Sequence, residues 1–382
     1  MKNYSRRERV ADALDHIEPD RVPADITLSP GAYAILCDHL GEKFEPYKWD
    51  DWNHATPSAE VLEKLGVDVY HVDIGAEPEG FTIDKTEFKD AWGINKRKII
   101  NDDGSFMYCF TDTPLKDAKT IDEINSYKWP LPEQLVSLTD ERVSEIKNLF
   151  NNTDFALTAT FGGNIQERPH FLIGMEQWFM NFYDNPELNC ALMDKIMEIQ
   201  MGVDRIVIDK IGKYLTYFRF NGEDVGTQKG PLYSPDIFKE YAMPRLMNEW
   251  KTAKQLFLKQ NPRGKVAIHS CGSIYHFIPL FIEMGADIIN PVQVNADNMD
   301  TGIIGREFGD KVSFHGAVDS QDVLEHGTPE DVRKEVRKRM ADLGAGGGYI
   351  VAPSHNIQES VPVKNTIALY EAVQEYGKYP LI

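Results

Sequence analysis

The sequence lacks features that mark several common classes of protein. Its four cysteines, Cys37, Cys109, Cys190 and Cys271, are far apart and follow no regular spacing, so they do not indicate a disulfide framework. No run of about 18 apolar residues is present to span a bilayer. The charged residues 1–13 also lack the apolar core of a secretion signal. We therefore expect a cytoplasmic protein that does not associate with membranes.

Positive charge is also scarce. The 41 Lys and Arg residues are outnumbered by 60 Asp and Glu residues, which gives a net charge of −19. Such a balance argues against binding to the phosphate backbone of nucleic acids. The 382 residues and the hydrophobic content of 42% are sufficient for one large core, so residues 1–382 are predicted to form a single domain.

Short apolar runs of strand length alternate with longer helical patterns along most of the chain. This alternation predicts an α/β fold of eight βα units, a closed (β/α)8 TIM barrel. A strand-containing insertion, residues 80–132, interrupts it after the second strand and contains a hairpin turn at 102–104. The expected strands are 22–28, 68–74, 155–161, 215–220, 265–270, 286–292, 312–318 and 349–354.

The expected helices are bounded by residues that favour helix ends. Ser234-Pro235 and Thr328-Pro329 each place a capping hydroxyl before a proline at the first helical position. The helices are predicted at 5–14, 57–65, 133–150, 185–213, 234–260 and 329–343.

A histidine and a cysteine end the fifth expected strand. Side chains in a strand repeat every two residues, so His269 and Cys271 point to the same side. Imidazole nitrogen and thiolate sulfur are both good zinc ligands. The alternative is a core histidine beside an inert buried cysteine. The barrel prediction favours zinc, because functional residues of such barrels lie at the carboxyl ends of the strands.

The other strand ends carry further polar side chains. Asp73, Glu223 and His315 are the candidate catalytic residues, and the alternative for each is a structural role as a capping or hydrogen-bonding residue at the barrel mouth. Tyr217 is a candidate for substrate binding, or else packs in the core. The remaining substrate-binding candidates are Asp224, Gln293 and Asn356.

Several motifs resemble the uroporphyrinogen decarboxylase superfamily. The motifs are Gly222-Glu-Asp-Val-Gly-Thr-Gln228, His269-Ser-Cys-Gly272, Gly285-Ala-Asp-Ile-Ile-Asn-Pro291, Asn298-Met-Asp300 and the glycine-rich stretch from Gly346 to Gln358. The resemblance extends over nearly the whole chain and implies the barrel fold that the strand pattern predicts.

Two branches of that superfamily are alternatives. The decarboxylases clamp a substrate with eight carboxylates by an arginine-rich turn after the first strand, but residues 25–33 contain no arginine. The corrinoid-dependent methyltransferases carry a His-x-Cys turn that holds zinc, which His269 and Cys271 match. The position of a further cysteine ligand in the thiol-methylating members is occupied by His355. The resemblance therefore implies His355 or Glu223 as the third zinc ligand.

This resemblance implies a zinc-dependent methyltransferase. It would move a methyl group from a small methylated oxygen compound, such as methanol, a methyl ether or a methoxylated aromatic, to a corrinoid (cobalamin) on a partner protein. The alternatives are transfer from methylcobalamin to a thiol or a folate, a decarboxylase-like activity, and a non-catalytic corrinoid-protein or ligand-binding role. Relatives in the superfamily also lead us to expect a homodimer.

Overall fold

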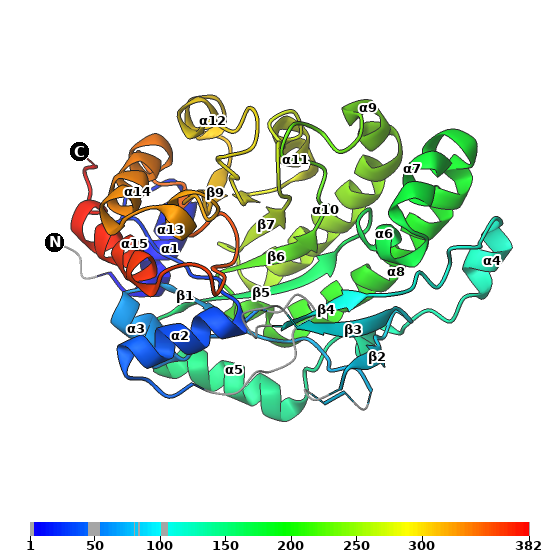
Figure 1. Cartoon of the computed structure of the whole chain (residues 1–382), viewed down its shortest axis with the longest axis horizontal. Coiled ribbons are helices and arrows are strands. Elements are labelled where there is room, and N and C mark those ends of the chain that lie inside the picture. Colours follow the sequence, from blue (N-terminus) through cyan, green and yellow to red (C-terminus); the bar gives the residue numbers. More distant parts are fainter. Residues whose placement is uncertain (1–3, 45–53, 80, 83–84, 101–105, 382) are drawn as a thin grey trace.

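Seven parallel strands form one curled sheet at the centre of the molecule (Figure 1). The structure is a computed structural model and describes residues 4–44, 54–79, 81–82, 85–100 and 106–381. The order β1-β5-β6-β7-β8-β9-β10 follows the chain, as in a barrel of successive βα units. The strands are β1 (Val69–His71), β5 (Ala156–Gly163), β6 (Tyr217–Gly222), β7 (Lys265–His269), β8 (Ile288–Asn290), β9 (Ser313–His315) and β10 (Tyr349–Ile350).

An irregular segment at the position of the predicted first strand joins the two edges of this sheet. Ala24 forms a parallel bridge with Val351, just after β10. On its other side, the backbone oxygen of Ala24 accepts a hydrogen bond of 2.9 Å from Asp68 N, just before β1. Pro23 has no N–H to donate, which limits regular pairing here. The barrel prediction is confirmed, although its first strand consists of isolated bridges.

The helices pack around the outside of the sheet (Figure 1). The six helices predicted from sequence are all present, but 234–260 is divided by a π-helical stretch, Phe238–Ala242. The sequence did not lead us to predict α2, α4, α6, α7, α11, α12, α13 or α15. The helices are α1 (Arg6–Leu14), α2 (Pro30–Leu40), α3 (Ala59–Leu65), α4 (Ile121–Ser126), α5 (Asp140–Asn152), α6 (Arg168–Leu172), α7 (Met175–Asp184), α8 (Pro186–Ile211), α9 (Pro235–Ile237), α10 (Met243–Gln260), α11 (Ile278–Met284), α12 (Thr301–Phe308), α13 (Val323–His326), α14 (Pro329–Leu343) and α15 (Val363–Tyr376).

Helix ends are fixed by the residues expected to cap them. The Thr328 hydroxyl accepts a hydrogen bond from Asp331 N, and the Asp331 carboxylate accepts one in return from Thr328 N, which forms a capping box before α14. Ser234 caps α9 by accepting a hydrogen bond from Asp236 N. No helix among the described residues is long and apolar enough to cross a membrane.

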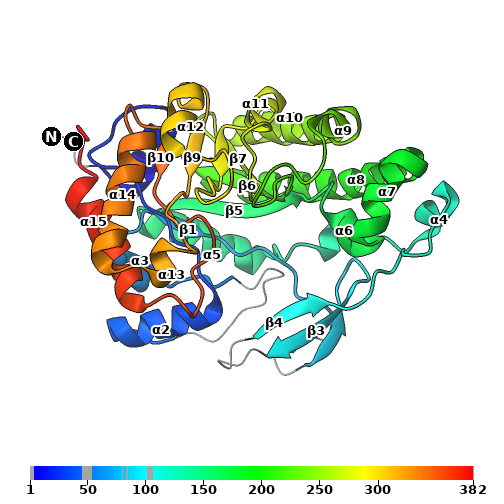
Figure 2. The same ribbon diagram turned by 45° about the horizontal axis from the view of Figure 1, so that its top comes forward.

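A three-stranded antiparallel sheet lies between β1 and β5 in the sequence and projects from the barrel (Figure 2). It consists of β2 (Glu87–Lys89), β3 (Asn95–Ile100) and β4 (Phe106–Phe110). These strands lie within the predicted insertion, whereas the expected turn at 102–104 lies outside the described residues. The connection between β2 and β3 reaches the central cavity through Asp90 and Trp92. The assignment of residues 1–382 to one domain stays a prediction.

Candidate metal centre and active-site cavity

The site is built on two successive layers of side chains. Residues near the start of the strands form a small apolar cluster: Val69, Ala156, Tyr217, Ala267, Ile288 and Ile350, with Val10 and Leu14 of α1. Side chains on one face of a strand recur every two residues. The positions two residues further along are accordingly His71, Thr158, Arg219, His269 and Asn290. A polar layer therefore follows the apolar one towards the carboxyl ends of the strands.

A cavity of about 410 Å³ opens at this polar layer. Apolar parts of its wall come from Trp92, Phe161 and Phe220. Its ionisable lining residues, among those described, are four histidines, four carboxylates, two arginines and one cysteine: His54, His71, His269 and His355; Asp73, Asp90, Glu167 and Asp224; Arg168 and Arg219; and Cys271. Carboxylates therefore outnumber guanidinium groups two to one.

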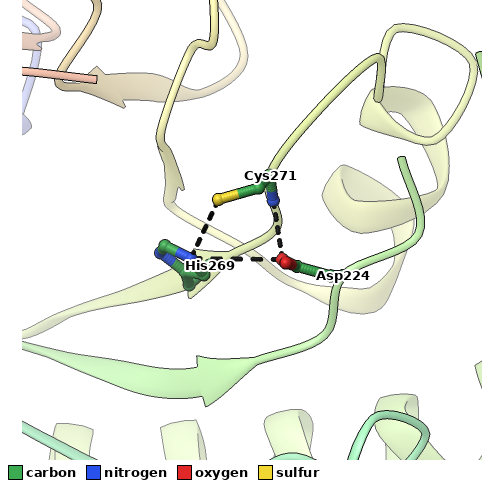
Figure 3. Close-up of side chains that lie close together, drawn as sticks. All are labelled: Asp224, His269 and Cys271. Atoms are coloured by element: carbon green, nitrogen blue, oxygen red, sulfur yellow. Dashed lines mark hydrogen bonds and ion pairs between the residues drawn. The ribbon is translucent and has the colours of Figure 1, made fainter. Parts of the chain in front are cut away.

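Asp224, His269 and Cys271 form a cluster that could hold a metal ion (Figure 3). His269 Nε2 lies 3.3 Å from Cys271 Sγ and 4.0 Å from Asp224 Oδ1. The three ligand atoms all lie within 4.8 Å of one another. The Cys271 backbone N–H also donates to Asp224 Oδ1 at 2.7 Å, which ties the turn after β7 to the end of β6.

Two glycines allow these turns to approach each other. Gly272 has a φ of +82°, which favours glycine. A Cβ atom on Gly226 would lie 2.6 Å from the backbone oxygen of Cys271, closer than a real side chain is found. The Gly222–Gln228 and His269–Gly272 motifs are therefore two halves of one contact.

Asn290 of β8 fixes the orientation of His269. Its side-chain oxygen accepts a hydrogen bond from His269 Nδ1 at 2.7 Å and another from Arg219 Nη1 at 3.1 Å. With Nδ1 donating, Nε2 presents a lone pair to the cluster. Burial and the charge of Arg219 lower the pKa of His269 to about 3, so the ring is neutral, as a metal ligand must be.

Burial outweighs the available positive charge at the other two members of the cluster. Burial, together with the charges of Asp224 and Glu167, raises the pKa of the Cys271 thiol well above its ordinary value. Burial also raises the pKa of Asp224, and the hydrogen bond from the Cys271 backbone only partly opposes this. A divalent cation would reverse both effects, because it favours the ionised forms of its ligands.

Glu223, predicted as a zinc ligand and catalytic residue, does not belong to this three-residue cluster. Its two carboxylate oxygens accept hydrogen bonds from Ile165 N at 2.7 Å and Gln166 N at 3.0 Å. The side chain is buried, and it joins the loop after β5 to the end of β6. The neighbouring Asp224, predicted to bind substrate, takes the position beside His269 and Cys271.

The remaining candidates differ in their distance from the reaction space. His355, Asp73 and Asn356 line the cavity, but His355 is not part of the three-residue cluster. Gln293 supports the cysteine turn by accepting a hydrogen bond of 2.8 Å from Gly272 N. Tyr217 is buried in the apolar layer, where it packs with Val69 and Ala267. The structure therefore places Tyr217 and Gln293 away from the cavity lining.

A buried carboxylate, which sequence reasoning missed, lies beneath the cavity. Asp25 Oδ2 accepts a hydrogen bond of 2.7 Å from His315 Nε2 and is 2.8 Å from His71 Nε2. His315 Nδ1 in turn is 2.7 Å from Asn290 Nδ2. A continuous chain of hydrogen bonds therefore leads from His71 through Asp25, His315 and Asn290 to His269.

Comparison with known proteins agrees with this architecture. The sequence profile described as uroporphyrinogen decarboxylase (URO-D) matches residues 122–376, two thirds of the chain. The chain belongs to the uroporphyrinogen decarboxylase family. The match begins after the three-stranded sheet and includes both turns that carry Asp224, His269 and Cys271.

Individual members of the family align with only part of this chain. Uroporphyrinogen decarboxylase from Actinobacillus succinogenes is 39% identical over 72 residues, 19% of this chain and 20% of that protein. The enzyme from Saccharophagus degradans is 24% identical over 193 residues, half of each chain. The alignments thus span from a fifth to half of these relatives. A solved structure described as a methyltransferase from Methanosarcina mazei has a TM-score of 0.63 at 16% identity, covering 98% of this chain and 99% of that chain, which supports the barrel fold.

His71, Asp25, Asn290 and Glu167 were not predicted as site residues, but the sequence held a signal for two of them. His71 lies two residues before Asp73 in an expected strand, so period two places both side chains on the same face. Asn290 lies within the Gly285–Pro291 motif. Asp25 lay within an expected strand, where nothing distinguished it from a core polar residue.

Proposed function

We propose that this protein transfers a methyl group from a small methylated oxygen compound to the cobalt of a corrinoid protein, using zinc held by His269, Cys271 and Asp224. The cluster of nitrogen, sulfur and oxygen donors at the mouth of the barrel is the observation that carries the proposal. Asp224 thereby replaces Glu223 and His355 as the third ligand.

The donor set fits zinc. Tetrahedral zinc with nitrogen, oxygen and sulfur ligands requires donor atoms about 3.5 Å apart, close to the separations of 3.3 and 4.0 Å in the cluster. The hydrogen bond from His269 Nδ1 to Asn290 is the kind of outer contact that zinc-binding histidines make. Three protein ligands are also typical of catalytic zinc, which keeps one position for substrate.

Bound zinc would act as a Lewis acid on the substrate oxygen and stabilise the negative charge that develops there. The protein's own contribution is to hold the donor and exclude water. Phe161, Phe220 and Trp92 provide apolar surface for the organic group of the methyl donor. Burial keeps the site at low polarity, where electrostatic stabilisation is strongest.

Charge around the cavity favours a small neutral substrate over a polycarboxylate. Four carboxylates and two arginines line it among the described residues. Arg219 already donates to Asn290, and Arg168 lies 5.0 Å from the ring of Trp92. A substrate with eight carboxylates would find two guanidinium groups among the described lining residues, both already engaged, and removing its charges from water without partners is costly.

A decarboxylase is the second candidate, because the matched relatives carry that name. Methyl transfer from a methylated corrinoid to a thiol or a folate, with the same zinc ligands, is a third. These candidates differ in their reactants, so a single set of assays distinguishes them.

The test combines purified zinc-loaded protein with a chemically reduced cob(I)alamin and a panel of methanol, methyl ethers, methoxylated aromatics and methylamines. We expect absorbance of methylcobalamin to appear with at least one oxygen-linked methyl donor. Consumption of methylcobalamin only when a thiol or folate is added would support methyl transfer to a thiol or a folate. Release of carbon dioxide from uroporphyrinogen would support a decarboxylase.

Metal analysis tests the site independently of turnover. We expect one zinc ion for each chain in the wild type and less than a tenth of that in Cys271→Ser after exposure to a chelator. Zinc that is absent from the wild type, or retained equally by Cys271→Ser, would contradict the proposal. His326→Gln, an exposed change on α13, serves as the control for handling losses.

A further inference from the structure

We propose that His71, held by Asp25, is a second catalytic group in the cavity and donates a proton to the oxygen that loses its methyl group. The inference rests on the proposed methyl-transfer function, and it adds a proton donor on the wall formed by β1. The pairing of a buried carboxylate with a cavity-lining imidazole carries it.

The geometry holds His71 in one orientation. Its Nε2 lies 2.9 and 2.8 Å from the two oxygens of Asp25. Asp25 is fully buried, whereas a quarter of the His71 side chain is exposed, and His71 lines the same cavity as His269 and Cys271. The ring therefore has one edge against the carboxylate and another part of its surface towards the reaction space.

Asp25 remains ionised under ordinary conditions. Burial would raise its pKa, but the charge of His71 and hydrogen bonds from His315 and His71 outweigh burial and hold the pKa far below the ordinary value. An ionised carboxylate only accepts hydrogen bonds, so Nε2 of His71 carries a proton. No described residue forms a hydrogen bond with Nδ1. Nδ1 is thus the ring nitrogen that is available to a substrate in the cavity.

Two other histidines near the cavity are less suited to this role. His315 is buried and engaged at both ring nitrogens, by Asp25 and by Asn290. His355 lines the cavity, but burial and the nearby His54 lower its pKa, so it is neutral near pH 7. His71 has an ionised carboxylate to stabilise its imidazolium form, as the aspartate does in a Ser-His-Asp triad.

Cobalt(I) supplies an electron pair to the methyl carbon and becomes methylcobalt(III), and the carbon–oxygen bond breaks with its electron pair on oxygen. The proton on Nδ1 of the His71 imidazolium passes to that oxygen, which gives the alcohol or phenol. His71 is left neutral with Nε2–H still bonded to Asp25, and water restores the proton before the next turnover.

The experiment compares His71→Gln with the wild type across methyl ethers and methoxylated aromatics whose leaving alcohols or phenols differ in acidity. A general acid contributes about 10²–10⁴-fold, and basic leaving groups need it most. We expect a loss in that range for simple alkyl methyl ethers, falling towards none for aromatic ethers with strongly electron-withdrawing substituents. Zinc content should equal that of the wild type, and His326→Gln should retain full activity.

A uniform loss across the series, or no loss, overturns the role of His71 while leaving the methyl-transfer proposal intact. A wild type that is inactive with every donor overturns the methyl-transfer function, and with it the reaction in which His71 would act. A measurement that does not depend on turnover tests whether Asp25 orients the His71 ring, separately from any folding defect of a variant. Nitrogen-15 spectra should show wild-type His71 protonated at Nε2, and Asp25→Asn should abolish that preference. A His71 ring protonated at Nδ1 alone in the wild type would contradict the proposal.

Discussion

Two groups of histidine and carboxylate side chains border the same cavity and differ in their electrostatics. Asp25 lies between His71 and His315, and these partners hold its pKa far below the ordinary value. Asp224 lies beside His269 and Cys271, and burial raises its pKa. Histidine N–H groups satisfy the carboxylate of Asp25, whereas burial leaves the pKa of Asp224 raised, and a bound cation would lower it.

The difference between the pKa shifts of Asp25 and Asp224 comes from their hydrogen-bond partners and neighbouring charges, because both residues are aspartates. Asp25 accepts hydrogen bonds from two imidazoles. Asp224 accepts one hydrogen bond, from the Cys271 backbone, and lies near Glu167. Burial and the charges of Asp224 and Glu223 raise the pKa of Glu167 well above its ordinary value. Asn290 connects the two groups, since it contacts both His315 and His269. One face of the barrel therefore holds the Asp25 group next to the cluster that we propose binds zinc.

The largest expected effect distinguishes Asp224 from His355 as the third ligand. We expect Asp224→Asn to weaken zinc affinity by more than the roughly 10–100-fold that loss of an outer hydrogen-bond partner costs. His355→Asn should change the affinity less than threefold, because His355 lies outside the cluster. Competition with a zinc-binding dye measures both variants. Equal losses, or a larger loss in His355→Asn, would reject Asp224 as the ligand.

The connection between the two groups is broken by Asn290→Leu, which keeps the branched shape of the side chain and removes both polar atoms. His269 then loses the acceptor for Nδ1, so we expect zinc affinity to fall about 10–100-fold. The same dye competition checks it. Asn290→Asp, which keeps an acceptor for His269, is the matched variant and should retain tighter zinc binding than Asn290→Leu. The reverse order would show that Asn290 does not orient His269.

A smaller effect is expected from Glu223→Gln, which tests the structural role assigned to this carboxylate. One of the two backbone donors, Ile165 N or Gln166 N, then loses a good acceptor, so unfolding in urea should become easier by about 1–3 kcal/mol. Zinc content should stay at the wild-type level. Loss of zinc with unchanged stability would return Glu223 to the metal site.

Acid sensitivity separates the two groups in the metal-free protein. The folded pKa of His269, about 3, lies below the unfolded value of 6.5. The unfolded chain therefore binds an extra proton between these values, and stability falls as pH decreases from 6.5 towards 3, by at most about 1.4 kcal/mol per pH unit. Asp25, with its lowered pKa, contributes stability that is lost only below about pH 4.

Urea denaturation at several pH values checks this expectation. Metal-free His269→Asn should lose stability less steeply than the metal-free wild type between pH 6.5 and 4. Burial lowers the pKa of His170 to about 4. This residue contributes equally to the pH dependence of stability in both proteins, so its effect cancels in the comparison. Parallel curves over this range would contradict the assigned pKa of His269.

Much of the fold follows from local patterns in the sequence. Apolar runs at regular intervals predicted seven strands that the structure contains, and the capping residues Ser234 and Thr328 predicted helix starts. His269 and Cys271 were placed together because period two in a strand is a local property. The irregular first strand was harder to predict, since its pairing depends on Val351 and Asp68.

The sequence by itself determined the family, the barrel and the His-x-Cys turn, because these depend on short motifs and on the alternation of apolar runs and helical patterns along the chain. Only the tertiary structure decided that Asp224 and not Glu223 lies beside that turn. Adjacent residues at a strand end point in different directions, and the hydrogen bonds from residues 165 and 166 hold Glu223 away. Likewise, Asp25 and His71 are 46 residues apart and meet because barrel closure brings the first segment beside β1.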